Sequence, residues 1–357
     1  MTMTLKTTFR VCSILIPLLL MDLRSYGNAL PGLSLEELAS RSDVIAIAKV
    51  DKISKVGNGT VVIQSQTLQA ELMEASARVT LVLKGKILLP VLKVKFALPL
   101  SPAGWAGYSG VAEQSTRLIF LKEASGGAFT FTNPYYPSLP APADSAEQKL
   151  DSGQALTSPP DLVKTVVSVE CGAIASLSNA AAERTEAIWV MRKRTEPCIN
   201  GALHTAFGSS DQQLRLTAAA SLLMENDISV LAAAYDEANR LPMDSYLRLN
   251  LASAIRDGVQ NANAIPYLNR ILQSEDPVMR RAAASALRNI GSKACVVALA
   301  NALNDPDKAT LYYAVVGLAE IEGMPEKKPS MEDFDTNPSP YLDYWRIWAK
   351  EHLTSIH

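Results

Sequence analysis

Histidine is scarce in this chain, and the residue clusters on which most enzymes depend are missing as well. The three histidines are His204, His352 and His357, and none has a second histidine or an acid at the spacing of a metal-binding helix. The segment 107–110 has the order Gly-Tyr-Ser-Gly, which lacks the residue that a GxSxG nucleophile elbow places between serine and the second glycine. The sequence therefore predicts no catalytic site, no metal site and no cofactor, and we expect the protein not to be an enzyme.

Long basic runs and phosphate-binding loops are also absent. The formal net charge is −2, and the longest run of lysine and arginine is Arg192-Lys193-Arg194, which we interpret as a solvated helix face. A nucleic-acid backbone requires a clustered basic face, so nucleic acid is not expected as a ligand. Lys84-Gly-Lys86 lacks the glycines that precede the lysine of a phosphate loop, and it is predicted to be a turn at the end of a strand.

Residues 1–29 have the pattern of a signal peptide. Lys6 and Arg10 precede the apolar stretch 11–21, which is too short to span a bilayer, and small residues lead up to Ala29. We expect cleavage after Ala29 and a secreted or periplasmic protein. An uncleaved anchor is the alternative, and membrane contact is expected only through this segment in that case.

Only four cysteines occur, and none forms a CxxC pair of the kind found at zinc sites. Export permits a disulfide, and Cys171 with Cys198 is the possible pair because both fall in the helical region before the clearest repeats. Cys295 lies in the apolar run 294–300 and is predicted to be an inert core residue. Cys12 lies in the segment that signal cleavage removes.

The rest of the composition is that of a folded protein with more than one domain. Hydrophobic residues make up 48% and charged residues 20% of 357 residues, a length that exceeds what one core usually organises. We therefore expect an α+β multidomain chain, with a small N-terminal β-barrel or sandwich followed by a helical superhelix.

The β-rich part is predicted over residues 30–135. A short helix at 34–40, with Ser34 as its N-cap, precedes short runs rich in β-branched and aromatic residues. Gly57-Asn58-Gly59 and Gly126-Gly127 are turn signals between these runs. The predicted strands are residues 44–50, 61–67, 78–83, 91–98, 117–121 and 128–132.

This region resembles the OB-type barrel of netrin-like and protease-inhibitor-like domains in exported proteins. The resemblance rests on Arg-Val-Thr-Leu-Val-Leu-Lys-Gly at 78–85, on Arg-Leu-Ile-Phe-Leu-Lys at 117–122 and on the closing glycine turn. Inhibitory members of that group use an N-terminal cysteine after signal cleavage. Leu30 stands at that position, which argues against the protease-inhibitor-like activity that the resemblance implies as an alternative.

Residues 136–160 are predicted to be a linker. The segment is rich in proline, serine, alanine and aspartate, a composition that opposes both helix and sheet. Its prolines are Pro137, Pro140, Pro142, Pro159 and Pro160.

Beyond the linker, apolar residues repeat every 32 residues over residues 161–323, and five segments align without gaps. The aligned positions fall at i, i+3 and i+4 within each segment, which places them on one stripe of a helix. A neighbouring column holds mostly small residues and is expected to face an adjacent helix; it reads Trp189, Ser221, Ser253, Ser285 and Gly317. The predicted repeat core consists of Ala219, Leu222, Leu223, Leu251, Ile255, Ala283, Leu287, Val315 and Leu318.

Paired helices at this period, with Asp-Pro turns and the sequence Arg-Arg-Ala-Ala-Ala-Ser-Ala-Leu at 280–287, resemble HEAT repeats of the short bacterial type, an armadillo-like α-solenoid. The resemblance implies a protein-binding or scaffold role with an unidentified protein or peptide partner. Similar short repeats occur in bilin lyases, so a bilin-lyase-like catalytic chaperone is the enzyme-class alternative.

Residues 324–357 are predicted to cap the open end of the solenoid, because a stack of repeats exposes an apolar flank unless a terminal element covers it. Tyr341, Tyr344, Trp345 and Trp348 fall at i, i+3, i+4 and i+7 of one helix. An aromatic ligand site is the alternative for this stripe.

Overall fold

The structure is a computed structural model of the whole chain, and it describes residues 33–63, 66–100, 111–133, 138–144, 158–192 and 194–353. The predicted signal peptide, residues 1–29, lies outside these ranges. Within them, no helix combines the length and the apolar character that a membrane crossing requires.

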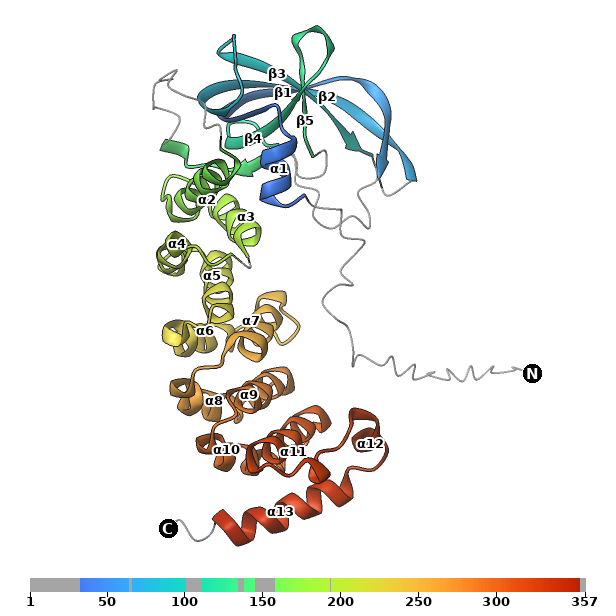
Figure 1. Cartoon of the computed structure of the whole chain (residues 1–357), viewed down its shortest axis with the longest axis vertical. Helices are drawn as coiled ribbons and strands as arrows, with labels where there is room; N and C mark the ends of the chain where they lie inside the picture. Colours follow the sequence, from blue (N-terminus) through green and yellow to red (C-terminus); the bar gives the residue numbers. More distant parts are fainter. Residues whose placement is uncertain are drawn as a thin grey trace, which may run out of the picture.

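A β-sheet occupies one end of the molecule and a helical array extends away from it (Figure 1). The chain enters the sheet through α1 (Leu35–Arg41), whose N-cap Ser34 exchanges hydrogen bonds with Glu37 in a capping box. The strands are β1 (Val44–Ile63), β2 (Gln66–Lys84), β3 (Val91–Pro99), β4 (Thr116–Glu123), β5 (Phe129–Phe131) and β6 (Ser138–Pro140).

The first two strands differ from the prediction, because β1 and β2 form one long ribbon where the sequence suggested three short runs. The glycines at 57–59 lie inside β1 and pair with residues 70–72 of β2. A Cβ at Gly59 would lie about 3.1 Å from the Leu72 side chain, so glycine there allows this side chain to pack against the backbone. The expected turn at residues 57–59 is therefore wrong, whereas the turn at Gly126 and Gly127 forms with positive φ angles of 77° and 73°.

The strand order is β1-β2-β3-β5-β4-β6, and β1 also pairs with β4, so the pairings form a circuit. The circuit is narrowest between β3 and β5, a parallel contact of only two residue pairs. The sheet is consequently not the regular barrel that the sequence suggested. β6 lies inside the predicted linker and pairs with β4 through Arg117, Leu118 and Ile119, so the start of that segment is part of the sheet.

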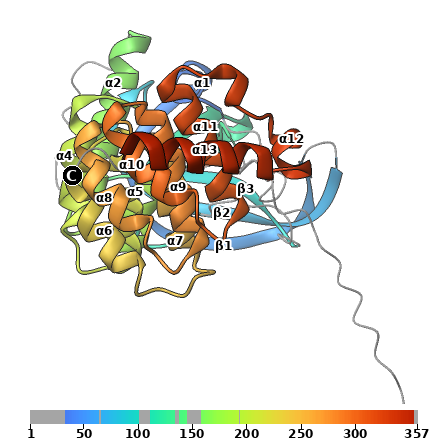
Figure 2. The same cartoon turned by 90° about the horizontal axis from the view of Figure 1, so that it is seen from below.

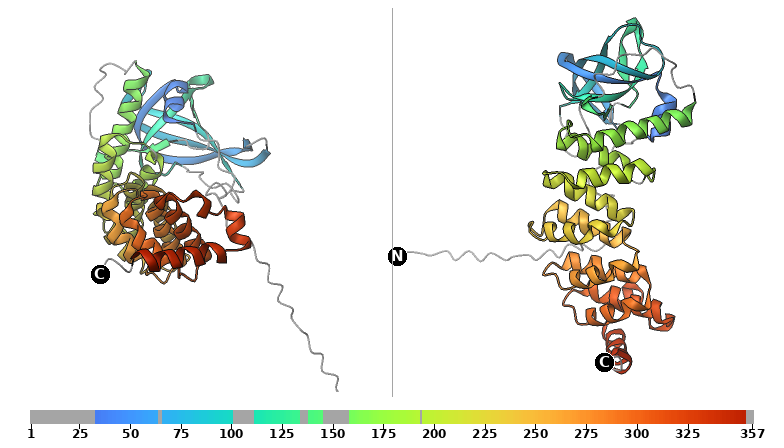
Figure 3. Two further views of the ribbon diagram at one scale, coloured as in Figure 1. Left: turned by 60° about the horizontal axis from the view of Figure 1, so that its bottom comes forward. Right: turned by 90° about the vertical axis from the view of Figure 1, so that its left-hand side faces the viewer.

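The helical array consists of antiparallel pairs stacked in a single column (Figure 3). One side is formed by α2 (Pro159–Ala175), α4 (Pro197–Phe207), α6 (Leu231–Ala238), α8 (Ile265–Ile271) and α10 (Val296–Ala302). The other side is formed by α3 (Ala181–Met191), α5 (Gln212–Met224), α7 (Tyr246–Gly258), α9 (Pro277–Ile290) and α11 (Lys308–Glu322).

The nine predicted repeat-core residues, from Ala219 to Leu318, are all 0% exposed. They lie on α5, α7, α9 and α11, where each hides its side chain against the neighbouring pair. Ion pairs also connect successive repeats. Arg248 on α7 contacts Asp276, the N-cap of α9, at 2.5 Å, and Arg281 on α9 contacts Asp307, the N-cap of α11, at 2.5 Å.

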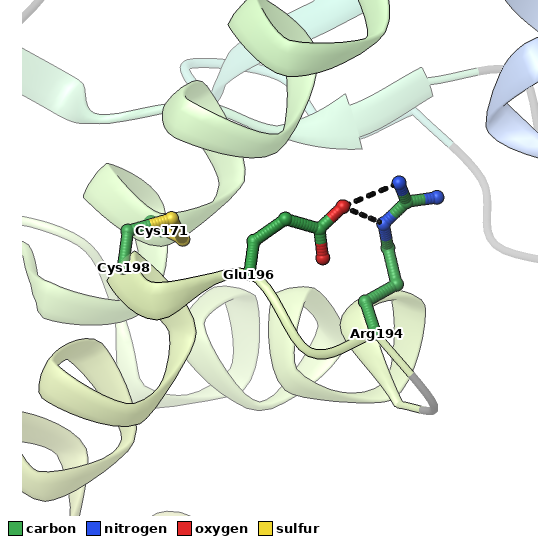
Figure 4. The surroundings of a disulfide bond; sticks show 4 residues. All are labelled: Cys171, Arg194, Glu196 and Cys198. Atoms are coloured by element: carbon green, nitrogen blue, oxygen red, sulfur yellow. Dashed lines mark hydrogen bonds and ion pairs between the residues drawn. A yellow bond between two sulfur atoms is a disulfide. The ribbon is translucent and has the colours of Figure 1, made fainter.

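The Cys171 and Cys198 sulfurs are joined in a disulfide that links α2 to α4 (Figure 4). Beside it, the Arg194 guanidinium binds Glu196 and reaches Glu36 on α1 at 3.1 Å. Cys295 is a free, buried cysteine. The disulfide thus connects the first helices of the array to each other, and the Arg194 contact with Glu36 connects the array to α1 at the sheet end of the molecule.

The array ends with α12 (Met331–Thr336) and α13 (Ser339–Leu353), and α13 lies across its last helices (Figure 2). Trp345 is 0% exposed, and Tyr341, Tyr344 and Trp348 pack partly buried against the same core. Arg346 donates to the Leu303 carbonyl at 2.8 Å and so satisfies an unpaired group after α10. The aromatic stripe therefore lies where a cap is needed.

Candidate binding surface

One side of the array is recessed. The sheet at one end and α12 at the other both project on the side of α3, α5, α7, α9 and α11 (Figures 1 and 3). We call the exposed face of these five helices the inner face. On α7 it follows the stripe of Tyr246, Leu249, Asn250 and Arg256, which are spaced at i, i+3, i+4 and i+10.

The first half of the inner face carries large exposed side chains. Trp189 on α3 is 41% exposed, Met224 on α5 is 40% exposed and Tyr246 on α7 is 50% exposed. Leu249, one turn after Tyr246, adds a fourth apolar side chain. Together with Arg192, these residues form what we call the Trp189 patch. Tryptophan, tyrosine, arginine and methionine are the residue types enriched at the centres of protein interfaces.

Arg192 links α3 to α7. Its guanidinium lies 4.9 Å from the centre of the Trp189 ring, and it donates to the Asn250 side-chain oxygen at 3.5 Å, past the intervening α5. On α5, Thr217 and Ala218 have short side chains and are buried.

The electrostatics of the patch combine burial with a nearby acid. Burial lowers the pKa of Arg192, and the carboxylate of Asp257 opposes that effect. Arg256 shares Asp257 through a 2.8 Å contact. No ion pair engages the guanidinium of Arg192 among the described residues, so it can donate hydrogen bonds to an oxygen atom of a partner.

The sequence missed this patch for two identifiable reasons. Trp189 belongs to the column of small residues that was expected to face a neighbouring helix. Ser253, Ser285 and Gly317 of this column are buried as expected. Trp189 is too large for that position, and its side chain is exposed on the surface. Arg192 and Arg194 also differ from the solvated face that was predicted for them. Arg192 covers Trp189 and Arg194 bonds Glu196, so both are part-buried.

The arrangement around His204 is structural. Its Nε2 atom lies 2.8 Å from the Asp227 carboxylate, which also accepts from Ser229 Oγ at 2.7 Å and from Asn200 at 3.3 Å. Asp227 caps the turn Ile228–Val230. Because Ser229 donates to the carboxylate and not to the imidazole, these residues do not form a nucleophile–base pair. In the described ranges, no group of three or more histidine, cysteine or acidic side chains could hold a metal ion.

Comparison with known proteins identifies the array. The sequence model of a family described as HEAT repeats matches residues 231–319 and 265–349, which together span α6 to α13. No curated protein matches the chain. The pairing of helices that the matched part shows continues back to α2 without a break. Residues 231–349 are therefore similar to HEAT repeats, and α2 to α5 extend the same stack of helix pairs.

Proposed function

We propose that this protein is an exported, non-enzymatic scaffold that binds a protein or peptide through the Trp189 patch on its inner face. HEAT repeats are typical of protein-interaction modules, and a stack of repeats makes a long rigid surface whose specificity lies in its exposed side chains. The observation that carries the proposal is the exposure of Trp189, Met224 and Tyr246 on the inner face, together with the guanidinium of Arg192 over the Trp189 ring.

A capture experiment tests the binding surface. The immobilised protein is exposed to a cell-envelope extract, and the retained proteins are compared among the wild type, Tyr246→Ala and Tyr267→Ala. Tyr267 is a matched control because it is 42% exposed and lies on α8, on the opposite side of the array. We expect a saturable partner on the wild type and on Tyr267→Ala that is lost on Tyr246→Ala. Retention of the same proteins by Tyr246→Ala would sink the proposal, as would the absence of any saturable partner.

Export is supported by the pattern of residues 1–29 and by the Cys171–Cys198 disulfide, since disulfides persist in oxidising compartments. N-terminal sequencing of the protein recovered from its host tests this part. The expected mature chain begins at Leu30, and a chain that begins at Met1 in the cytosolic fraction would contradict export.

For the sheet, we infer an OB-type unit that serves as a second module. The support is the circuit of pairings β1-β2-β3-β5-β4 closed by β1–β4, and Lys84 of β2 donates to the Ala39 carbonyl of α1. A fold comparison with an experimental structure of this part of the chain would check the inference, and an open, non-closing sheet would contradict it.

A further inference from the structure

The loop between β2 and β3 holds two adjacent leucines away from the protein. Leu88 is 83% exposed and Leu89 is 67% exposed, and Val91, at the start of β3, is 41% exposed. Single exposed apolar side chains are common on protein surfaces, but neighbouring ones gathered on a protruding loop mark a contact site.

This loop is fixed at both ends and in its middle. At its start, Gly85 has a φ of 79°, and a Cβ there would lie 2.4 Å from the Asp43 carbonyl oxygen. At its end, the Pro90 carbonyl accepts from the Val79 amide at 2.9 Å. Between them, Ile87 packs against the core of the sheet. Since Ile87 takes the inward position, the two leucines after it are held outward by the fold.

Lysines flank the leucines in the sequence. Lys86 precedes them, and Lys93 and Lys95 follow on the exposed positions of β3. Lys93 pairs with Glu74 at 3.1 Å, whereas no ion pair engages Lys86 or Lys95 within the described part of the chain. The surface around the leucines thus has an excess of positive charge.

We propose that this loop attaches the protein to the surface of an anionic lipid bilayer. Leu88 and Leu89 insert among the acyl chains, and Lys86, Lys93 and Lys95 contact the anionic headgroups. A bilayer accepts protruding apolar side chains without a shaped pocket, so a convex loop with basic flanks fits it better than it fits a protein groove. Two leucines give weak, reversible attachment, and membrane contact is then not confined to the signal segment.

Co-sedimentation with lipid vesicles tests the proposal. The full chain is mixed with vesicles of phosphatidylcholine that contain about one third phosphatidylglycerol, and with vesicles of phosphatidylcholine alone. Leu88→Ser is compared with Leu177→Ser, a matched leucine that is 84% exposed just beyond α2. Both variants keep the apolar stretch 11–21, so a difference between them reports on the loop.

We expect the wild type and Leu177→Ser to sediment with the anionic vesicles, less so as salt rises, and Leu88→Ser to bind roughly tenfold more weakly. Lys95→Gln should weaken binding to the anionic vesicles and leave the small binding to neutral vesicles unchanged. An unchanged melting temperature for Leu88→Ser shows that the variant is folded. The proposal is overturned if Leu88→Ser binds vesicles as the wild type does, or if the wild type binds neither kind of vesicle. It is also overturned if Leu88→Ser changes only the oligomeric mass in size-exclusion chromatography, because that result would assign the loop to a protein contact.

Discussion

The guanidinium of Arg117 on β4 and the carboxylate of Glu186 on α3 form a two-point ion pair, with N–O distances of 2.7 and 3.0 Å. Arg117 also donates to the Ser138 side chain and carbonyl on β6, and its side chain is nearly buried. One residue thereby joins two strands of the sheet to the first helices of the array. The apolar core is continuous across the same boundary, from Phe120 to Val166.

Glu170 on α2 lies at this junction with its carboxyl fully buried and neither oxygen hydrogen-bonded. Burial raises the pKa of Glu170 well above its usual range; Arg117 acts to lower it and Glu186 to raise it. The folded protein therefore keeps a proton that the unfolded chain releases near pH 4.5. The associated stability is complete below that pH and is lost as the pH rises through the folded pKa.

Glu170→Gln removes this ionisation while keeping the shape of the side chain. We expect the free energy of unfolding at pH 8 to rise by roughly 1–3 kcal/mol, with little change at pH 4. Denaturant titration at both pH values measures it. The neighbouring Glu186→Gln is the contrasting variant, and it should destabilise the protein because Arg117 loses its charge partner. An equal effect of Glu170→Gln at both pH values would refute the assignment.

Gly258 marks the closest approach between two helices of the array. A Cβ at this position would lie 2.2 Å from the Leu223 carbonyl oxygen at the end of α5. Gly258→Ala should therefore push α7 from α5 and lower the free energy of unfolding by about 1–3 kcal/mol. Gly201 on α4 has no atom within 4 Å of such a Cβ, so Gly201→Ala should stabilise its helix by about 0.5–1 kcal/mol. Thermal unfolding of both variants checks the opposite signs.

The disulfide should contribute substantially to stability. Cys171 and Cys198 are separated by 27 residues in sequence, and closing a loop of that size restricts the unfolded chain by about 3 kcal/mol. The double variant Cys171→Ala/Cys198→Ala should therefore have a lower melting temperature than the wild type. Cys295→Ala removes only a buried free thiol, so the melting temperature of this variant should respond to added reductant as that of the wild type does. A wild-type melting temperature that does not change on reduction would contradict the role of the disulfide.

Asp227 should govern part of the acid response. Burial acts to raise its pKa, but hydrogen bonds from Ser229, His204 and Asn200 outweigh it and lower the pKa of Asp227 to about 2. Since the folded pKa lies below the ordinary value of 3.8, the stability is present above that pH and is lost as the pH falls toward 2. Asp227→Asn should cost about 2 kcal/mol at pH 7 and much less at pH 2. Urea unfolding at both pH values measures the difference, and a constant cost would argue against this linkage.

The helical array was predictable because its information is local and repeated. Residues such as Leu222 and Leu287 recur at a fixed spacing, and each repeat makes the same contacts, so one period determines many positions. The burial of Trp345 followed from the same logic, because a stack of repeats needs a cap.

The remaining features depend on partners distant in sequence. The glycines at 57–59 are a turn signal by themselves, and only pairing with residues 70–72 makes them part of a strand. Nothing near Glu170 in sequence indicates that Arg117 from β4 approaches it. The exposure of Trp189 depends on how α3 packs against its neighbours, which the sequence of α3 alone does not show.

The central claim is that the inner face of the array contacts a protein partner. A photo-crosslinking amino acid placed at position 246 in the living host tests it most directly, with position 267 on the opposite side as the matched site. The account predicts a discrete protein adduct from position 246 and none from position 267. Adducts from both positions alike, or from position 267 alone, would contradict it.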